Sequence, residues 1–326
     1  MTIVSGMVFN GHSGAVVTDE RGSYGGRQSD IMQKIYTLGD PKALFALVGA
    51  AGNTMFAVDV LDTAREYLAQ SASHGETGHS HAPMNGRRLA SAIGAAMIQA
   101  KRTYIDGYLS SQFGLREVDF IRGRTETGHG EPIVIDPAIR QRYDRILDGS
   151  DPAMGDMLRN QFVILTKDAE SVRLWSVWPG AANPLPMPFP YTCIGSGGDA
   201  GDAVLRDFVV NRTRGARADI DPVEGVATML YATHRAGETN VGVGGTPHIA
   251  IISNGEAPII PSEQNSRLAM EAVRGGKAGL LTERRVLQAI DDLVFQQADF
   301  SAVEMRLRKQ AKDWNKLDLL LRGYHL

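Results

Sequence analysis

The sequence predicts a mixed α+β fold with antiparallel sheets. Short apolar strands follow one another through roughly the first fifty residues, stretches with helical spacing come next, and strands return before a final run of helices. Strict βαβ alternation, which would favour a parallel sheet, is not seen. Two sheets covered by two layers of helices fit this order.

Four strands are expected near the N-terminus, separated by turn-rich segments such as NGHSG and RGSYGGRQSD. They are Thr2–Phe9, Gly14–Asp19, Lys34–Leu38 and Ala43–Gly49. After Asn53, apolar residues recur at helical spacing in two blocks, one on either side of a polar, glycine-rich loop. Two long helices are therefore expected to follow the strands.

The second half of the chain repeats this order. Strands are expected at Gln161–Thr166, Val172–Trp178, Tyr191–Ile194 and His248–Ser253, and helices at Asp199–Arg212 and Pro222–Arg235. Residues 108–159 are interpreted as an insertion in which EVDFIRGR and EPIVIDP resemble short strands. We expect one domain over 1–254 and a helical extension over 255–326 that packs on it, with a capping box made by Ser301 and Glu304.

Composition narrows the range of partners. The chain has 326 residues, 43% of them apolar, and a formal charge of -3, so no concentrated basic surface for nucleic acid or an anionic membrane is expected. No apolar stretch approaches the ~20 residues that span a bilayer, and no signal-peptide pattern opens the chain. A cytoplasmic protein is expected. Its single cysteine, Cys193, excludes an internal disulfide and is interpreted as a buried structural thiol.

A loop with the sequence SASHGETGHSHAPMNG contains His74, His79 and His81, and histidine is a good ligand for zinc or nickel. A surface loop is favoured over a metal site, because no set of Cys, Asp or Glu ligands at a fixed spacing accompanies these histidines. We therefore expect no metal and no cofactor.

Thr2 is a candidate nucleophile. Methionine aminopeptidases act when the second residue is small, so removal of Met1 would expose the α-amine of Thr2. Such an amine has a pKa of roughly 7.7–8.0 and can act as general base on the hydroxyl of its own residue. Many proteins begin Met-Thr without any catalytic meaning, so this hypothesis depends on companion residues.

The companions resemble those of proteasome β subunits and the bacterial HslV peptidase. The opening MTIVSGMVFNGHSGAVVTDER is similar to the first hairpin of that family, with Asp19 at its aspartate, and Lys34 in KIYTL has the spacing of its catalytic lysine. The resemblance implies that Lys34 lowers the pKa of the Thr2 amine and stabilises the developing alkoxide, while Asp19 holds Lys34. A plain Asp–Lys ion pair between strands is the alternative.

Two glycine-rich segments extend the resemblance. FALVGAAG is similar to the turn from which the family donates an N–H to the oxyanion, which implies this role for Gly49, with Gly52 as the rival in register. CIGSGG resembles the turn that places a serine, here Ser196, near the threonine amine. A phosphate-binding turn is the alternative, but no lysine follows in the Walker arrangement.

The segment HRAGETNVGVGG resembles the end of the helix where the family has a supporting aspartate. Glu238 takes that place here, with a longer side chain. Val241 replaces a nearby serine of the family, and Thr239 is the candidate to compensate.

The family resemblance implies a four-layer αββα sandwich, the fold of N-terminal-nucleophile hydrolases. It implies a threonine peptidase that acts on peptides or proteins inside a homo-oligomeric ring, with an ATPase unfoldase as a further candidate partner. An amidohydrolase or a peptide ligase with the same nucleophile is one alternative. A structural ring subunit that retains Met1 is another, because MTIVS also aligns with Met1 in the nucleophile's place.

Overall fold

The structure is a computed structural model of the whole chain. It describes residues 2–24, 27–30, 32–40, 44–73, 85–125, 133–151, 154–168, 171–178, 184–212, 219–253 and 257–321. The histidine-rich loop with His74, His79 and His81 lies outside these residues, as does Met1.

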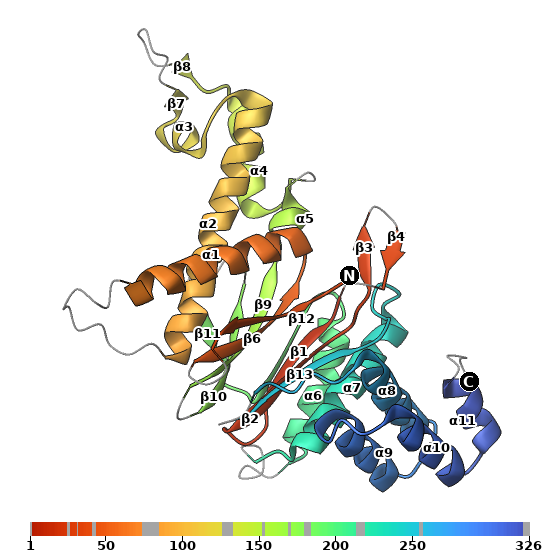
Figure 1. Cartoon of the computed structure of the whole chain (residues 1–326). Coiled ribbons are helices and arrows are strands. Elements are labelled where there is room, and N and C mark those ends of the chain that lie inside the picture. The colour runs from red at the N-terminus through yellow and green to blue at the C-terminus, as the bar shows by residue number, and fades with distance from the viewer. Residues whose placement is uncertain are drawn as a thin grey trace.

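Two antiparallel sheets form the centre of the molecule (Figure 1). The first sheet has the order β12-β1-β2-β13, with β1 at Val4–Val8, β2 at Ser13–Thr18, β12 at Tyr191–Ile194 and β13 at His248–Ser253. The second has the order β11-β10-β9-β6-β5, with β5 at Ile35–Gly39, β6 at Phe45–Ala51, β9 at Gln161–Lys167, β10 at Val172–Val177 and β11 at Leu185–Pro186. The predicted α+β class with antiparallel sheets is confirmed.

The sheets pack face to face because their central strands, β1, β2, β6 and β9, bury residues on both faces. Val4 and Val16 of the first sheet meet Leu47 and Val163 of the second in a shared core. Two glycines permit this close approach: a Cβ on Gly6 would lie 2.5 Å from a Val163 methyl, and one on Gly49 would lie 2.4 Å from a Val4 methyl.

Helices cover the outer face of each sheet. α1 (Thr54–Ser73) and α2 (Gly86–Phe113) pack on the second sheet, while α6 (Gly198–Val210) and α7 (Pro222–Thr239) pack on the first. Beyond α7, the chain adds α8 (Glu263–Lys277), α9 (Glu283–Ile290), a π-helical turn (Asp291–Phe295), α10 (Phe300–Gln310) and α11 (Trp314–Leu321). Apolar residues of this last group, including Leu268 and Leu293, share one core with β2, β13 and α7.

The region predicted to be an insertion extends along the far part of α2, with α3 and the β7–β8 pair far from the sheets and α5 close to the start of β9 (Figure 1). It contains α3 (Glu117–Arg122), β7 (Arg124–Thr125), β8 (Ile133–Val134), α4 (Pro137–Asp148) and α5 (Gly155–Leu158). Phe120 of α3 stacks on Tyr143 of α4 with ring centroids 4.6 Å apart. The prediction of a strand at EVDFIRGR is wrong, because EVDFIR forms α3 and buries Phe120 on one helical face.

Two smaller differences between the predicted and the observed elements concern the N-terminus of one helix and a short hairpin. The capping box predicted at Ser301 is wrong: α10 begins at Phe300, and its N-cap is Asp299, whose side chain accepts from the N–H of Ala302. A short hairpin of β3 (Gly22–Tyr24) and β4 (Arg27–Ser29) forms within a segment that was predicted to be turn-rich. This hairpin lies beside the N-terminus (Figure 1).

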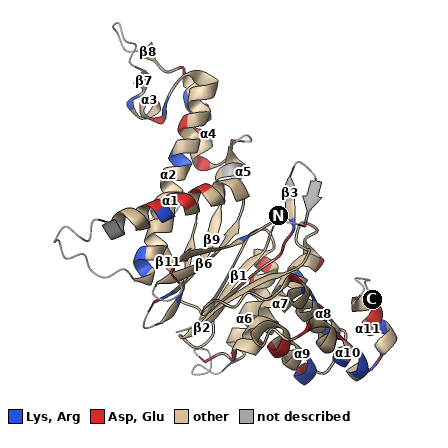
Figure 2. Ribbon diagram, in the orientation of Figure 1, with Lys and Arg blue, Asp and Glu red and all other residues tan. Residues whose placement is uncertain are grey.

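Charged residues lie mainly on the helices, where acidic and basic side chains are interspersed, while the strands of both sheets are largely uncharged (Figure 2). No helix within the part of the chain that the structure describes is both long and apolar enough to cross a bilayer.

Candidate active site

Asp19 is the centre of the candidate site. It follows β2 directly, and the pairing of Val4 with Thr18 in the β1–β2 hairpin brings it against the start of β1. Its side chain is fully buried. The Oδ1 atom accepts hydrogen bonds from Thr2 Oγ1 at 3.1 Å, from the N–H of Ile3 at 2.9 Å and from Lys34 Nζ at 2.7 Å. The Oδ2 atom accepts from the N–H of Gly244 at 3.2 Å.

Lys34 lies just before β5 and is only 6% exposed. Besides Asp19, its ammonium donates to the carbonyl of Arg21 at 2.6 Å. Burial lowers the pKa of Lys34 from the ordinary lysine value, and the charge and hydrogen bond of Asp19 oppose that effect. The structure therefore brings together an acid and a base that lie 15 residues apart.

Thr2 is held on its main chain as well as on its hydroxyl. Its N–H donates to Ser196 Oγ at 3.1 Å, and its carbonyl accepts from the N–H of Gly197 at 3.0 Å. Gly195 makes this close approach possible: its φ is +88°, and a Cβ there would lie 2.4 Å from the Thr2 carbonyl oxygen. The turn before α6 is thus built directly against Thr2.

The two glycines considered for the oxyanion donor lie at different places. Gly49 is inside β6, paired with Ile35 on one side and with Val163 on the other. Gly52 lies past the end of the strand with a φ of +125°, where a Cβ would strike the side chain of Asn160. The choice between them stays a prediction.

Glu238 is not brought to Asp19. It is 43% exposed on its side chain, and it pairs with Arg235 and with His234 of the same helix, the latter at 3.4 Å. The residue of α7 that faces the Ser196 turn is Ala236, which packs against Gly197. Because successive helical residues are rotated by about 100°, a position two residues beyond Ala236 faces away from the site.

The other two residues of that segment also lie apart from the cluster. The Thr239 hydroxyl donates to carbonyls of its own helix, those of Arg235 and Ala236. Val241 is 76% exposed, and its carbonyl accepts from Arg21 at 3.2 Å.

Asn240 is a site residue that the sequence analysis missed. It follows α7, and its Nδ2 donates to the Ser196 carbonyl at 3.1 Å while its Oδ1 accepts from the N–H of Gly242 at 3.0 Å. Asn240 therefore links two segments: the loop whose Gly244 N–H binds Asp19, and the turn that carries Ser196. An Asn that ends a helix before a glycine-rich loop is the signal that was available.

Arg21 and Asp30 close the base of the β3–β4 hairpin, with Arg21 Nε 2.9 Å from Asp30 Oδ1. The guanidinium of Arg21 holds the pKa of Asp30 below its ordinary value. This ion pair is partly exposed, so it orients the hairpin more than it stabilises the fold.

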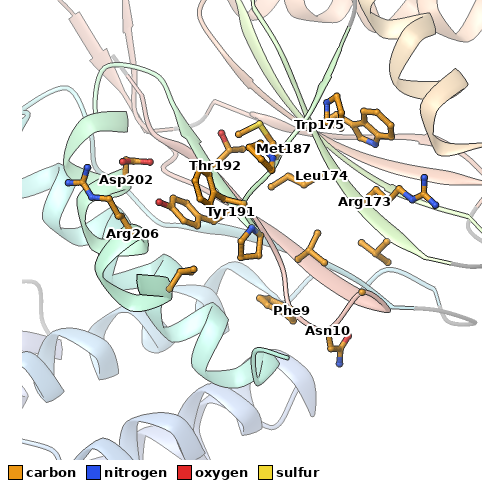
Figure 3. A pocket seen from close by; sticks show the side chains of 18 of the residues that line it. Phe9, Asn10, Arg173, Leu174, Trp175, Met187, Tyr191, Thr192, Asp202 and Arg206 are labelled. Atoms are coloured by element: carbon orange, nitrogen blue, oxygen red, sulfur yellow. The ribbon is translucent and has the colours of Figure 1, made fainter. Parts of the chain in front are cut away.

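An open cavity of about 1090 Å³ lies elsewhere, at the far end of β1 (Figure 3). Phe9, Tyr191, Trp175 and Arg206 are among the residues that line it. The strand from Thr2 to Phe9 spans about 23 Å, so this cavity is separate from the cluster around Asp19. Among the described residues, no group of three or more His, Cys, Asp or Glu side chains is arranged to hold a metal ion.

Neither a protein-family profile nor a curated protein matches this sequence. Solved structures do match by shape. The helical assembly of the Anbu complex from Pseudomonas aeruginosa has a TM-score of 0.55 at 14% identity, covering 85% of this chain and 93% of that one. Anbu, the ancestral β-subunit, from Yersinia bercovieri has a TM-score of 0.54 at 13% identity, covering 85% and 94%.

A Gly-1 mutant of Anbu from Hyphomicrobium sp. strain MC1 gives a TM-score of 0.53 at 16% identity, with 85% of this chain and 97% of that chain covered. At these identities the likeness concerns the fold alone. This chain has the mixed α+β, proteasome-like fold of the Anbu structures, with two antiparallel sheets and helices.

Proposed function

We propose that this chain is a proteasome-like threonine peptidase whose nucleophile is Thr2 after removal of Met1. The observation that carries the proposal is the buried cluster in which one oxygen of Asp19 accepts from both the Thr2 hydroxyl and the Lys34 ammonium. Ser196 stands at the main-chain nitrogen that would become the free amine. Three segments far apart in the sequence thus converge on one threonine.

The chemistry follows from these contacts. The free amine of Thr2 takes the proton of its own hydroxyl as Oγ1 attacks the carbonyl carbon of the substrate, forming a tetrahedral intermediate. Collapse of this intermediate breaks the C–N bond, the leaving amine takes the proton, and an ester remains on Thr2. Water then attacks the ester and releases the second product. The positive charge of Lys34 favours a neutral amine before attack and stabilises the developing alkoxide.

An N–H donor to the oxyanion belongs to the same proposal, with Gly49 as the first candidate and Gly52 as the second. Loss of such a donor costs about 3–4 kcal/mol of transition-state stabilisation. Glu238 has no part in this mechanism, because its side chain pairs with Arg235 and His234.

The four-layer αββα arrangement with an insertion over 108–159 and an extension over 255–326 is also proposed. The two sheets and their outer helices support it. A cytoplasmic homo-oligomer is proposed from the resemblance to proteasome-like proteins, one of which is described as a helical assembly. An ATPase unfoldase would supply unfolded chains to such an assembly.

Intact mass and N-terminal sequencing test the nucleophile, with and without a β-lactone or epoxyketone. We expect loss of Met1 and one adduct on Thr2. Thr2→Ala is the matched control, because alanine is also small and leaves Met1 removal intact while it deletes the hydroxyl. That variant should be processed, folded, unlabelled and inactive.

Two further outcomes separate the alternatives. If Met1 is retained, a second preparation is made in which cleavage of an N-terminal tag leaves Thr2 as the first residue. We expect the electrophile to label this protein. Should that protein remain unlabelled and inactive, the peptidase proposal is wrong and a structural subunit is favoured. Labelling at Thr2 with hydrolysis of small amides but not of peptides would favour an amidohydrolase.

A further inference from the structure

We infer that Asn160 and Gln161, two consecutive amide residues at the start of β9, are positioning residues that hold the two turns on either side of Thr2. This inference rests on the proposed function, since it assigns a catalytic consequence to their contacts. Neither residue was singled out by the sequence, and neither touches Thr2 in any contact the structure shows.

Asn160 holds the turn between β6 and α1. Its Oδ1 accepts from the N–H of Asn53 at 2.8 Å, and its Nδ2 donates to the carbonyl of Asn53 at 2.7 Å. The side chain therefore satisfies both polar groups of one main-chain residue, as a neighbouring strand would. Asn160 is completely buried, and Gly52 packs directly on it with the positive φ that this turn requires.

The same turn also starts α1. The Asn53 side chain accepts from the N–H of Phe56 at 3.1 Å, so Asn53 caps the first turn of the helix. Asn160 thereby fixes where β6 ends and where α1 begins. Both glycines considered for the oxyanion donor lie within four residues of this clamp, Gly49 in β6 and Gly52 in the turn itself.

Gln161 holds the other turn. Its Oε1 accepts from the N–H of Gly195 at 3.1 Å, one residue before Ser196. Since side chains of consecutive strand residues point to opposite faces, Asn160 and Gln161 reach in different directions from one place on β9. The strand register supports this arrangement. Gln161 pairs with Ala51 at the end of β6, so Asn160 lies beside the turn that follows β6.

The consequence is a fixed spacing between the turn that contacts the amine of the nucleophile and the segment proposed to bind the oxyanion. Ser196 contacts the Thr2 nitrogen, and the β6–α1 segment is proposed to supply the oxyanion donor. A displacement of about 1 Å between such groups costs on the order of 100-fold in rate. Gln161 and Asn160 set that distance through β9, which lies between β10 and β6 inside the second sheet.

Gln161→Met and Gln161→Glu form the matched test pair. Methionine has a similar length but no acceptor for the Gly195 N–H, whereas a glutamate carboxylate keeps an acceptor oxygen at neutral pH. Two measurements are made on the full-length protein: hydrogen exchange of peptides covering 193–198 and 49–56, and kcat and KM for a peptide substrate. Gln161 is partly exposed, so both variants are expected to fold.

For Gln161→Met we expect faster exchange over 193–198 and a fall in kcat of about 10- to 100-fold, with KM nearly unchanged. Gln161→Glu should restore both. Asn160→Asp, which keeps the acceptor and loses the donor, should speed exchange over 49–56 instead. Unchanged exchange in Gln161→Met, or faster exchange with full kcat, would overturn the inference.

The exchange measurement does not depend on activity. If the wild-type protein neither hydrolyses peptides nor reacts with the electrophile, the proposed function fails, and faster exchange in Gln161→Met would still support the tie to Gly195. If the wild-type protein is active and Gln161→Met matches it in both exchange and kcat, the inference alone fails.

Discussion

Replacing Asp19 and Lys34 singly and together separates a catalytic pair from a structural one. Asp19→Asn removes the negative charge beside the buried Lys34 ammonium, and with the amide oxygen in the place of Oδ1 it sets the NH2 group against the Gly244 N–H. Removing one partner of a buried ion pair costs about 3–5 kcal/mol of folding free energy. Lys34→Met leaves the Asp19 carboxylate with the donors of Thr2, Ile3 and Gly244, so its cost should lie at the lower end.

The double variant removes both charges. Because a buried ion pair replaced by uncharged groups is often close to neutral in stability, the free energy of unfolding should recover toward that of the wild type. Urea unfolding measures this, with the oligomeric state held constant across variants. Hydrolysis and electrophile labelling should remain lost in all three proteins, since the double variant restores packing and not the charge beside Thr2.

Two results would refute this reasoning. Additive single costs, with a coupling energy below about 0.5 kcal/mol, would mean that the 2.7 Å contact does not hold the site together. A double variant that hydrolyses peptides at the wild-type rate would leave the pair as a structural link between strands.

Two other predictions concern the turn beside Thr2 and the strand that leads into it. Gly195→Ala adds a Cβ 2.4 Å from the Thr2 carbonyl oxygen at a φ of +88°. The free energy of unfolding should therefore fall by at least ~1–2 kcal/mol, and labelling of Thr2 should slow. Unchanged labelling would show that the turn shifts freely. Burial raises the pKa of the Cys193 thiol in the folded protein above its ordinary value of 9.0, so its contribution to stability is present below that pH and is lost as pH rises. Cys193→Ala should lessen the loss of stability between neutral pH and pH above 9.0, measured by urea unfolding, and an unchanged slope would contradict this.

The central strands of the two sheets were predictable because both of their faces are buried. Apolar runs bounded by glycine and polar turns mark β1, β2, β6 and β9, and pairing of neighbouring strands then places Asp19 beside Thr2. Lys34 was predicted through the resemblance, which gives it the spacing of the family's catalytic lysine; in the structure it lies just before β5.

Contacts that depend on helix rotation could not be predicted in the same way. Glu238 and Ala236 differ by two positions, yet that difference decides whether a side chain faces Gly197 or solvent. The α10 cap was missed for another reason: Asp299 and Ser301 are both good N-cap residues, and Val303 and Leu307 lie in the helix with either start, so their spacing does not choose between the two. The clamp of Asn160 on Asn53 joins residues 107 positions apart, and no local pattern marks it.

The direction of the first side chains bears on which residue can be the nucleophile. Ile3 packs with Ala236 and Val243 on the helix side of the first sheet, whereas Val4 lies between the two sheets. The Thr2 hydroxyl reaches Asp19 Oδ1, and the Thr2 nitrogen reaches Ser196. Both contacts belong to Thr2 itself, one to its hydroxyl and one to its nitrogen, as a nucleophile that supplies its own base requires. These contacts favour the register that begins at Thr2, and they do so independently of the spacing to Lys34.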